Sequence, residues 1–282
     1  MANFDINNFV IDRVIRGIAL SQDDDSVLFS INQMQNVSLN CASESTDAVD
    51  ALGTPIATFY RAKSAEFSAE NALFDMNLMA TQLGTQKKVA NKDAKIVVPA
   101  MESFVVGDEK SYKLKHLPIA KTDEKGVVMK DENENTLYVT EIYELNGDST
   151  FGTKYEVATN ASETAFAYAS QTITLPTNVA KGTELFVMYE YETENAVEVV
   201  NSATQFPVGC KFVMEVLGCD VCDQTNLIYA YVIFPNFKLS PDFDWSVATD
   251  GTHPFSGKAQ QEYCDREKKL FSIIIPETPE EK

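Results

Sequence analysis

Apolar and polar residues alternate along much of the chain, which is the pattern of strands that are buried on one face. In residues 26–32, for example, Val27, Phe29 and Ile31 share one side of an extended segment. Stretches of the same kind recur toward the end of the chain and predict a mainly β protein. Further strands of this kind are expected at residues 35–40, 211–217, 227–234 and 269–275.

The longest such stretch lies at residues 57–74 and reads as two strand halves, 57–62 and 65–74. A short helical pattern follows, because apolar residues then recur at steps of three and four until Gly84 ends the pattern. The polar residues 43–53 before the stretch are expected to form a loop. A long β-ribbon that leads into one short helix offers an open sheet edge, and open edges are either protected or used to pair with another chain. We predict that this edge is used.

The middle of the chain has a different texture. After the charged linker at residues 86–95, short strand-like pieces alternate with turn signals such as Gly107-Asp108 and Asn146-Gly147-Asp148. Strands at this spacing predict a small β-sandwich of roughly 100 residues. We therefore predict two domains: residues 1–94 together with 204–282 form one, and residues 95–203 form a β-sandwich inserted into it.

The composition restricts the function. The chain has 282 residues with a formal net charge of −19, which repels the nucleic-acid backbone and argues against sequence reading of DNA. No stretch approaches about 18 apolar residues, so no membrane anchor is expected. The opening residues, MANFDINNFVIDR, lack the basic and apolar regions of a secretory signal.

Cysteines supply the sharpest candidate for a metal site. Cys219 and Cys222 form a CxxC pair, and Cys210 lies nine residues before it. Zinc binds four such ligands in a tetrahedron, so Cys264 or His253 would complete the set. The simpler interpretation is a pair of thiols in a hairpin loop, with Cys210 as a small buried apolar residue. We expect no cofactor, and zinc on these cysteines is the one candidate.

Catalytic patterns are weak. Asp242, Asp244 and Asp250 do not match the spacing of a calcium loop, and solvated loop carboxylates explain them. No nucleophile elbow accompanies His116 or His253, and no glycine-rich phosphate-binding motif occurs. We therefore predict that the protein is not an enzyme.

Two segments near the C-terminus resemble a known family. Residues 237–245, FKLSPDFDW, and 252–259, THPFSGKA, are similar to the end of the tail tube (major tail) proteins of tailed phages. The ribbon and helix at residues 57–84 resemble the long hairpin and single helix of that family. The resemblance covers residues 1–94 and 204–282 and implies a tail-tube-like β-sandwich or barrel. The inserted sandwich is similar to the immunoglobulin-like additions that many such proteins carry.

The resemblance implies an assembly. Hexameric rings of the chain would stack into a tube, with other tail proteins as partners, and the tube would be the conduit for DNA ejection. DNA would pass through a negatively charged lumen without specific binding. The protein would be assembled in the host cytoplasm and reside in the tail of the virion. We expect contacts between protomers through Phe59, Arg61, Lys63, Phe67 and Phe74, with the basic residues facing acidic edges.

Two alternatives stay open. One is another structural protein of the virion, such as a capsid decoration protein or a head–tail connector, which would assemble as a trimer or a dodecamer. The other is an extracellular β-sandwich that binds a carbohydrate or a receptor. That module would expose an aromatic platform, for which the candidates are Tyr143, Tyr155, Tyr189 and Tyr191.

Overall fold

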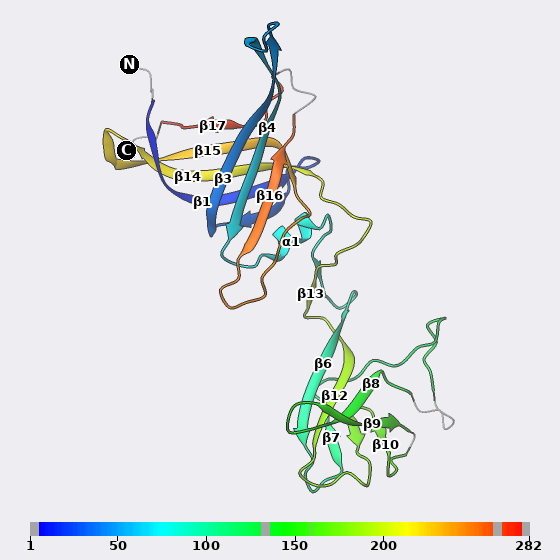
Figure 1. The fold of residues 1–282 in the computed structure, drawn as a ribbon. Helices are drawn as coiled ribbons and strands as arrows, with labels where there is room; N and C mark the ends of the chain where they lie inside the picture. Colours follow the sequence, from blue (N-terminus) through cyan, green and yellow to red (C-terminus); the bar gives the residue numbers. More distant parts are fainter. Residues whose placement is uncertain (1–5, 131–135, 159, 262–266, 278–282) are drawn as a thin grey trace. The chain divides into compact units, whose positions relative to one another are not determined.

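The computed structural model describes residues 6–130, 136–158, 160–261 and 267–277, and within them it is mainly β with one short helix (Figure 1). The sheets are curled, and the larger one forms a half-barrel. This confirms the fold class expected from the sequence. The chain divides into two compact units: unit 1 consists of Met1–Lys87 and Val199–Lys282, and unit 2 of Lys88–Glu198.

Unit 1 is built on one antiparallel sheet in the order β2-β1-β14-β15-β16-β4-β3, with β17 paired to β15. The C-terminal strands β14, β15 and β16 lie between two pairs of N-terminal strands, since β1 pairs with β14 and β4 with β16. Both segments of the chain are therefore needed to complete one sheet. The strands are β1 Phe9–Ser21, β2 Val27–Ile31, β3 Met34–Val49, β4 Pro55–Asn71, β14 Gly209–Asp220, β15 Asp223–Leu239, β16 His253–Ala259 and β17 Ser272–Ile274.

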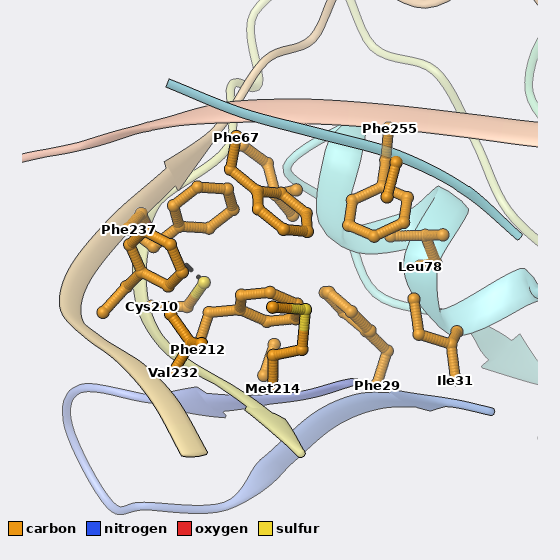
Figure 2. Close-up of a cluster of buried hydrophobic side chains, with 14 of the residues drawn as sticks. Phe29, Ile31, Phe67, Leu78, Cys210, Phe212, Met214, Val232, Phe237 and Phe255 are labelled. Carbon is orange, nitrogen blue, oxygen red and sulfur yellow. Dashed lines mark hydrogen bonds between the residues drawn. The ribbon is translucent and has the colours of Figure 1, made fainter. Parts of the chain in front are cut away.

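Phenylalanine side chains fill the space between the two halves of the curled sheet (Figure 2). Phe67 of β4 lies at the centre, 1% exposed, with four other rings at centroid distances of 5.3 to 5.9 Å. These rings tilt or meet edge to face, which are the favoured geometries of aromatic pairs. They come from β14, β15 and β16, so one cluster joins strands that are far apart in the sequence. The four rings belong to Phe212, Phe234, Phe237 and Phe255.

Helix α1, Met76–Gln82, packs into this cluster through Leu78, which is fully buried (Figure 2). Asp75 caps the helix, because its carboxylate accepts hydrogen bonds from the N–H groups of Asn77 and Leu78 at 2.9 and 2.7 Å. Gly84 follows with a φ of +69°, and a β-carbon there would lie 2.2 Å from the backbone of Phe206. The helix and its glycine stop agree with the pattern in the sequence. No helix of the described residues has the length and apolar character needed to cross a membrane.

Unit 2 contains a seven-stranded sheet in the order β6-β12-β8-β9-β10-β11-β7, in which only β9 and β10 run parallel within the described residues. A short ladder of β5 with β13 joins the segments that enter and leave the unit, where Val89 pairs with Val197. A second apolar cluster, which includes Ile142, Phe166 and Leu185, fills its interior. The strands are β5 Lys88–Val89, β6 Ile96–Val105, β7 Ser111–Lys113, β8 Thr140–Leu145, β9 Phe151–Val157, β10 Ala165–Ala169, β11 Thr172–Thr174, β12 Glu184–Thr193 and β13 Val197–Glu198.

One carboxylate is buried in unit 2. Glu102 of β6 is 4% exposed and accepts hydrogen bonds from the hydroxyl groups of Tyr189 and Tyr112 at 2.5 and 2.9 Å and from the N–H of Lys115 at 3.0 Å. Burial alone raises the pKa of this carboxyl, but the three hydrogen bonds outweigh burial and the net pKa lies below its ordinary value. The charge thus points inward and is fully engaged inside the unit.

Two segments expected to be loops are strands. β3 continues through residues 43–49, where Thr46 pairs with Phe59 and Ala48 with Ala57. Likewise, β14 and β15 continue until Asp220 pairs with Asp223, which leaves a turn of two residues. The loop prediction at residues 43–49 is wrong because both faces of this segment meet solvent, so that no alternation of apolar and polar residues marks it. Residues 223–227 of β15 are exposed in the same way, whereas Gly218 and Cys219 of β14 are buried.

Candidate assembly surfaces

β3 and β4 extend together beyond the body of unit 1 as a two-stranded arm, residues 41–64 (Figure 1). Every residue of the arm is exposed. Its turn is organised by Asp50, whose carboxylate accepts hydrogen bonds from the N–H groups of Leu52 and Thr54 at 2.8 and 2.9 Å. The bonds from Thr54 and Leu52 lower the pKa of Asp50. The arm is thus an ordered ladder held by its own strands and turn, without a core beneath it.

Large apolar side chains cover the arm. Leu52 at its turn is 91% exposed, and four others on the arm are more than half exposed. A two-stranded hairpin is marginally stable alone, and a concentration of exposed apolar residues marks a surface that binds something. The arm is therefore the strongest candidate for an assembly contact in unit 1. The other four residues are Val49, Ile56, Phe59 and Tyr60.

The two faces of the arm differ. Phe59 and Tyr60 are neighbours in β4 and so point to opposite faces. Ala62 has a φ of 48° where the register against β3 shifts, which marks a β-bulge. Arg61 lies opposite an acidic residue of β3, Glu44, and Lys63 is exposed beside it. The predicted contact residues Phe59, Arg61 and Lys63 all lie on this arm.

Phe67 does not belong to this surface. It follows the arm on the same strand, but its ring is the centre of the phenylalanine cluster and is 1% exposed. The prediction that Phe67 contacts another protomer is wrong, because the side chain is enclosed by its own unit. The strand passes from the arm into the body of the sheet between Ser64 and Ala65, where burial begins.

Phe74, the last of the predicted contact residues, lies just before helix α1. Its ring stacks on Trp245 at 4.6 Å and on His253 at 5.1 Å, and the residue stays 41% exposed. Trp245 comes from the loop between β15 and β16 and is itself about half exposed. Phe74 therefore packs this loop against the segment just before helix α1, and part of its ring stays exposed to solvent.

His253 fixes the helix to β16 through both ring nitrogens. Nδ1 accepts the N–H of Asp75 at 3.3 Å, so that Nε2 carries the proton and donates to the Oε1 of Gln82 at 2.8 Å. Gln82 in turn donates from its Nε2 to the carbonyl of Pro254 at 3.2 Å. His253 is fully buried, and burial lowers its pKa from the ordinary value of 6.5. The ring is neutral, because a second proton would have to sit on Nδ1, which already accepts the N–H of Asp75.

Acidification is expected to destabilise unit 1 through His253. The folded-state pKa is depressed, so this contribution to the free energy of unfolding is fully present above pH 6.5 and is lost as the pH falls below it. Urea unfolding between about pH 7.5 and 5, followed by the fluorescence of the single Trp245, should show a falling midpoint. His253→Gln should flatten this dependence, whereas the control His116→Gln should retain it. Equal slopes for wild type and His253→Gln would contradict the assignment.

The structure separates the cysteines of the candidate zinc site. Cys210 and Cys219 lie nine residues apart on β14, which is about 30 Å along a strand. Cys210 lies in the core, where burial raises its pKa to about 12 and its thiol donates to the carbonyl of Phe237. Cys222 is exposed in the turn after β14, and Cys264 lies outside the described residues. Cys210 therefore cannot share a metal with the CxxC pair.

The remaining polar candidates do not converge either. Asp242, Asp244 and Asp250 are exposed in the loop between β15 and β16. In the part of the chain that the structure describes, no three His, Cys, Asp or Glu side chains gather as a metal site would require. These carboxylates are solvated loop residues, as their spacing suggested.

The face of the large sheet opposite the phenylalanine cluster carries ion pairs. Lys258 of β16 meets Glu66 of β4 at 2.7 Å, and Arg16 of β1 meets Glu215 of β14 at 2.6 Å. Ser68 and Ser256 pair beside the first of these. This face combines both signs of charge with small polar side chains and is not uniformly acidic.

Four exposed apolar residues of the arm were not predicted as contact residues: Val49, Leu52, Ile56 and Tyr60. A signal for them was present, because Asp50 and Gly53 are typical turn residues between two extended segments. Gly53 has a φ of +85°, as such a turn requires. If that pair is taken as the tip of a hairpin, all four side chains are placed on the projecting arm.

Two comparisons with known proteins bear on these surfaces. A family model described as the YomU/Tube protein family matches residues 9–269. A search of the curated proteins finds no match. The family match spans nearly the whole chain and includes residues of both units.

Proposed function

The chain belongs to the YomU/Tube protein family and is a structural protein of a phage tail tube, and we propose that six copies form a ring and that rings stack into the tube. In this proposal the tube is the conduit through which DNA leaves the particle. The protein resides in the tail of the virion, contacts other tail proteins and is assembled in the host cytoplasm.

The arm supports the self-assembly. It combines the outer parts of two long strands, β3 and β4, with exposed apolar side chains, and in an isolated protomer neither face of it is covered. Such a surface is stabilised when it lies on another protomer. Arg61 and Lys63 add positive charge to the arm of an acidic chain, so the surface that receives it is expected to be acidic.

Charge supports passage of DNA without specific binding. The net charge of −19 repels phosphate groups at distances up to about a Debye length, roughly 10 Å. On the polar face of the large sheet, Lys258 and Arg16 neutralise Glu66 and Glu215. We therefore propose that the negative charge of the lumen comes from acidic residues outside these ion pairs. A lumen potential that is neutral or positive, calculated from the assembled tube, would contradict that part of the proposal.

Electron microscopy of the purified chain tests the assembly directly. Negative-stain images at high concentration should show hollow tubes or six-fold rings, and mass photometry at low concentration should show the species from which they grow. A chain that stays monomeric under all conditions would overturn the proposal. Rings of another symmetry would favour a head–tail connector, and trimers a capsid decoration protein.

The structure does not show the exposed aromatic platform that an extracellular binding module would need. Tyr189 is 1% exposed and Tyr155 is 7% exposed, so both belong to the interior of unit 2. Tyr143 and Tyr191 are partly exposed, and each stacks or packs on a neighbouring ring, Phe151 and His116 respectively. The four tyrosines do not form one exposed surface.

A further inference from the structure

The open sheet edges of the described residues are protected in different ways. Three of the edge strands, β2, β7 and β17, have five, three and three residues. The edge strand β3 is long, but its register shifts at three places and it carries Glu44 and Asp47 on the arm. Short strands, bulges and charges are the usual defences against pairing with another chain. β6 of unit 2 is different, because its ten residues pair with β12 without any shift of register.

The backbone groups at the open edge of β6 can be identified from the hydrogen bonds of its neighbours. Val106 bonds toward β12, since its N–H donates to Thr183 and its carbonyl accepts from Gly182, both at 2.9 Å. Alternate residues of an antiparallel strand face opposite edges. The residues that face away from β12 are therefore the odd-numbered ones, Val97, Pro99, Met101, Ser103 and Val105.

An independent bond agrees with this assignment. Glu190, which lies opposite Pro99, accepts a hydrogen bond from Ile119 at 2.8 Å on the other side of β12. Glu190 and Pro99 therefore do not bond each other, and the backbone of Pro99 faces the open edge. Pro99 has no N–H, which removes one donor from the edge and is the single protective device on it.

The side chains along this edge are uncharged. Met101 and Val105 are 64% and 63% exposed, and Val97 is about half exposed. The only ionisable residue of the strand is Glu102, and it points into the unit, where it binds Tyr189. The apolar surface continues inward across the sheet, because Met188 of β12 lies opposite Met101 and is also exposed.

We propose that β6 pairs antiparallel with β6 of a second copy of this chain, about a two-fold axis beside Met101. In this register Met101 meets Met101 of the second copy, Val97 meets Val105, and Pro99 meets Ser103. Apolar side chains then oppose apolar ones, and no two like charges meet. The other long open edges of the described residues, those of β3 and of β4 on the arm, are interrupted by register shifts, so the occupant that fits is the same strand.

This pairing is independent of the proposed tube. A two-fold contact is isologous, so it forms between any two chains whether or not they belong to a ring. The variant Phe59→Asp places a charge on the exposed apolar surface of the arm and should weaken contacts between protomers there. It therefore allows the β6 pair to be measured apart from tube assembly. Tubes without β6 pairing would support the tube and contradict the β6 pair. β6 pairing without tubes would support the pair and contradict the tube.

Cysteine cross-linking in the full chain tests the register. Met101→Cys, oxidised under mild conditions, should give a disulfide-linked dimer as the main product, above the background that the native cysteines give in a parallel sample. The matched control is Met188→Cys, which lies on the same face one strand further in. Its two copies would be three strand spacings apart, about 14 Å, beyond the reach of a disulfide, roughly 7 Å between Cα atoms. It should stay at background.

Two further variants complete the test. The double variant Val97→Cys, Val105→Cys should also cross-link, since these positions meet in the proposed register. Met101→Glu places two carboxylates opposite each other and should raise the Kd of the dimer, measured by sedimentation velocity, on the order of tenfold. A wild-type chain that is monomeric at all concentrations, cross-linking of Met188→Cys at the rate of Met101→Cys, or an unchanged Kd for Met101→Glu would each overturn the proposal.

Discussion

Replacing Phe67 by alanine is expected to lower the free energy of unfolding of unit 1 by about 3–5 kcal/mol, as for other buried phenylalanines. The ring is 1% exposed and contacts four other rings from three strands. Its removal leaves a cavity that the curled sheet cannot collapse around without moving strands from both ends of the chain. Since the whole stability of a domain is about 5–15 kcal/mol, much of the stability of unit 1 depends on this side chain.

Urea unfolding measures this effect unit by unit. The single Trp245 lies in unit 1, so its fluorescence follows that unit, while circular dichroism follows both. The control is Phe59→Ala on the same strand, which removes the same ring from an exposed position and should change the free energy of unfolding by at most about 0.5 kcal/mol. Similar losses for Phe59→Ala and Phe67→Ala would show that the cluster is not organised around Phe67.

The contrast between these two phenylalanines shows what local pattern can and cannot predict. Both lie in the strand halves predicted at residues 57–62 and 65–74, which the structure joins into one strand that ends at Asn71. The pattern of a strand does not say whether the strand lies over a core or has left it. Phe67 has partners from β14, β15 and β16, and no feature near Phe67 in the sequence specifies those partners. The assignment of Phe67 to the contact surface was therefore wrong, and that of Phe59 stays a prediction.

The error at residues 43–49 has the same origin. Strands are recognised by one buried face, and the arm has none, so its polar half reads as a loop. The β4 half was recognised because of its aromatic and β-branched residues. Pairing between the two halves follows from the turn at Asp50 and Gly53, which is a local signal, and not from burial. In a sequence, the turn residues are therefore the better signal of a hairpin whose two faces are both exposed.

The cysteines show a different limit. A CxxC pair with a third cysteine nearby satisfies the spacing of a zinc site, but spacing has a spatial meaning only when the backbone between the ligands is known. Nine residues of β14 are extended, and they hold Cys210 far from the pair. The strand character of residues 211–217 was correctly predicted. Applied to the cysteines as well, it would have excluded Cys210 from the site.

Phe59→Asp is expected to prevent or greatly weaken tube assembly while leaving the protomer folded. Phe59 is 55% exposed on the arm, so the substitution costs the isolated protomer little. In an interface, however, the new carboxylate is buried without a partner, which costs about 2 kcal/mol or more. The concentration at which tubes appear in electron micrographs should therefore rise by about tenfold or more. Tyr60→Asp makes the same change on the opposite face of the arm.

Comparison of these two variants identifies the face that binds. If one face lies on a neighbouring protomer and the other meets solvent, only one of the two substitutions should block assembly. A matched control is Val127→Asp, which adds the same charge at an exposed apolar residue of unit 2 and should assemble as wild type. Tube growth at the wild-type concentration by both arm variants would mean that the exposed apolar residues of the arm do not hold the tube together. Loss of assembly in Val127→Asp as well would mean that any added negative charge prevents assembly, whatever its position.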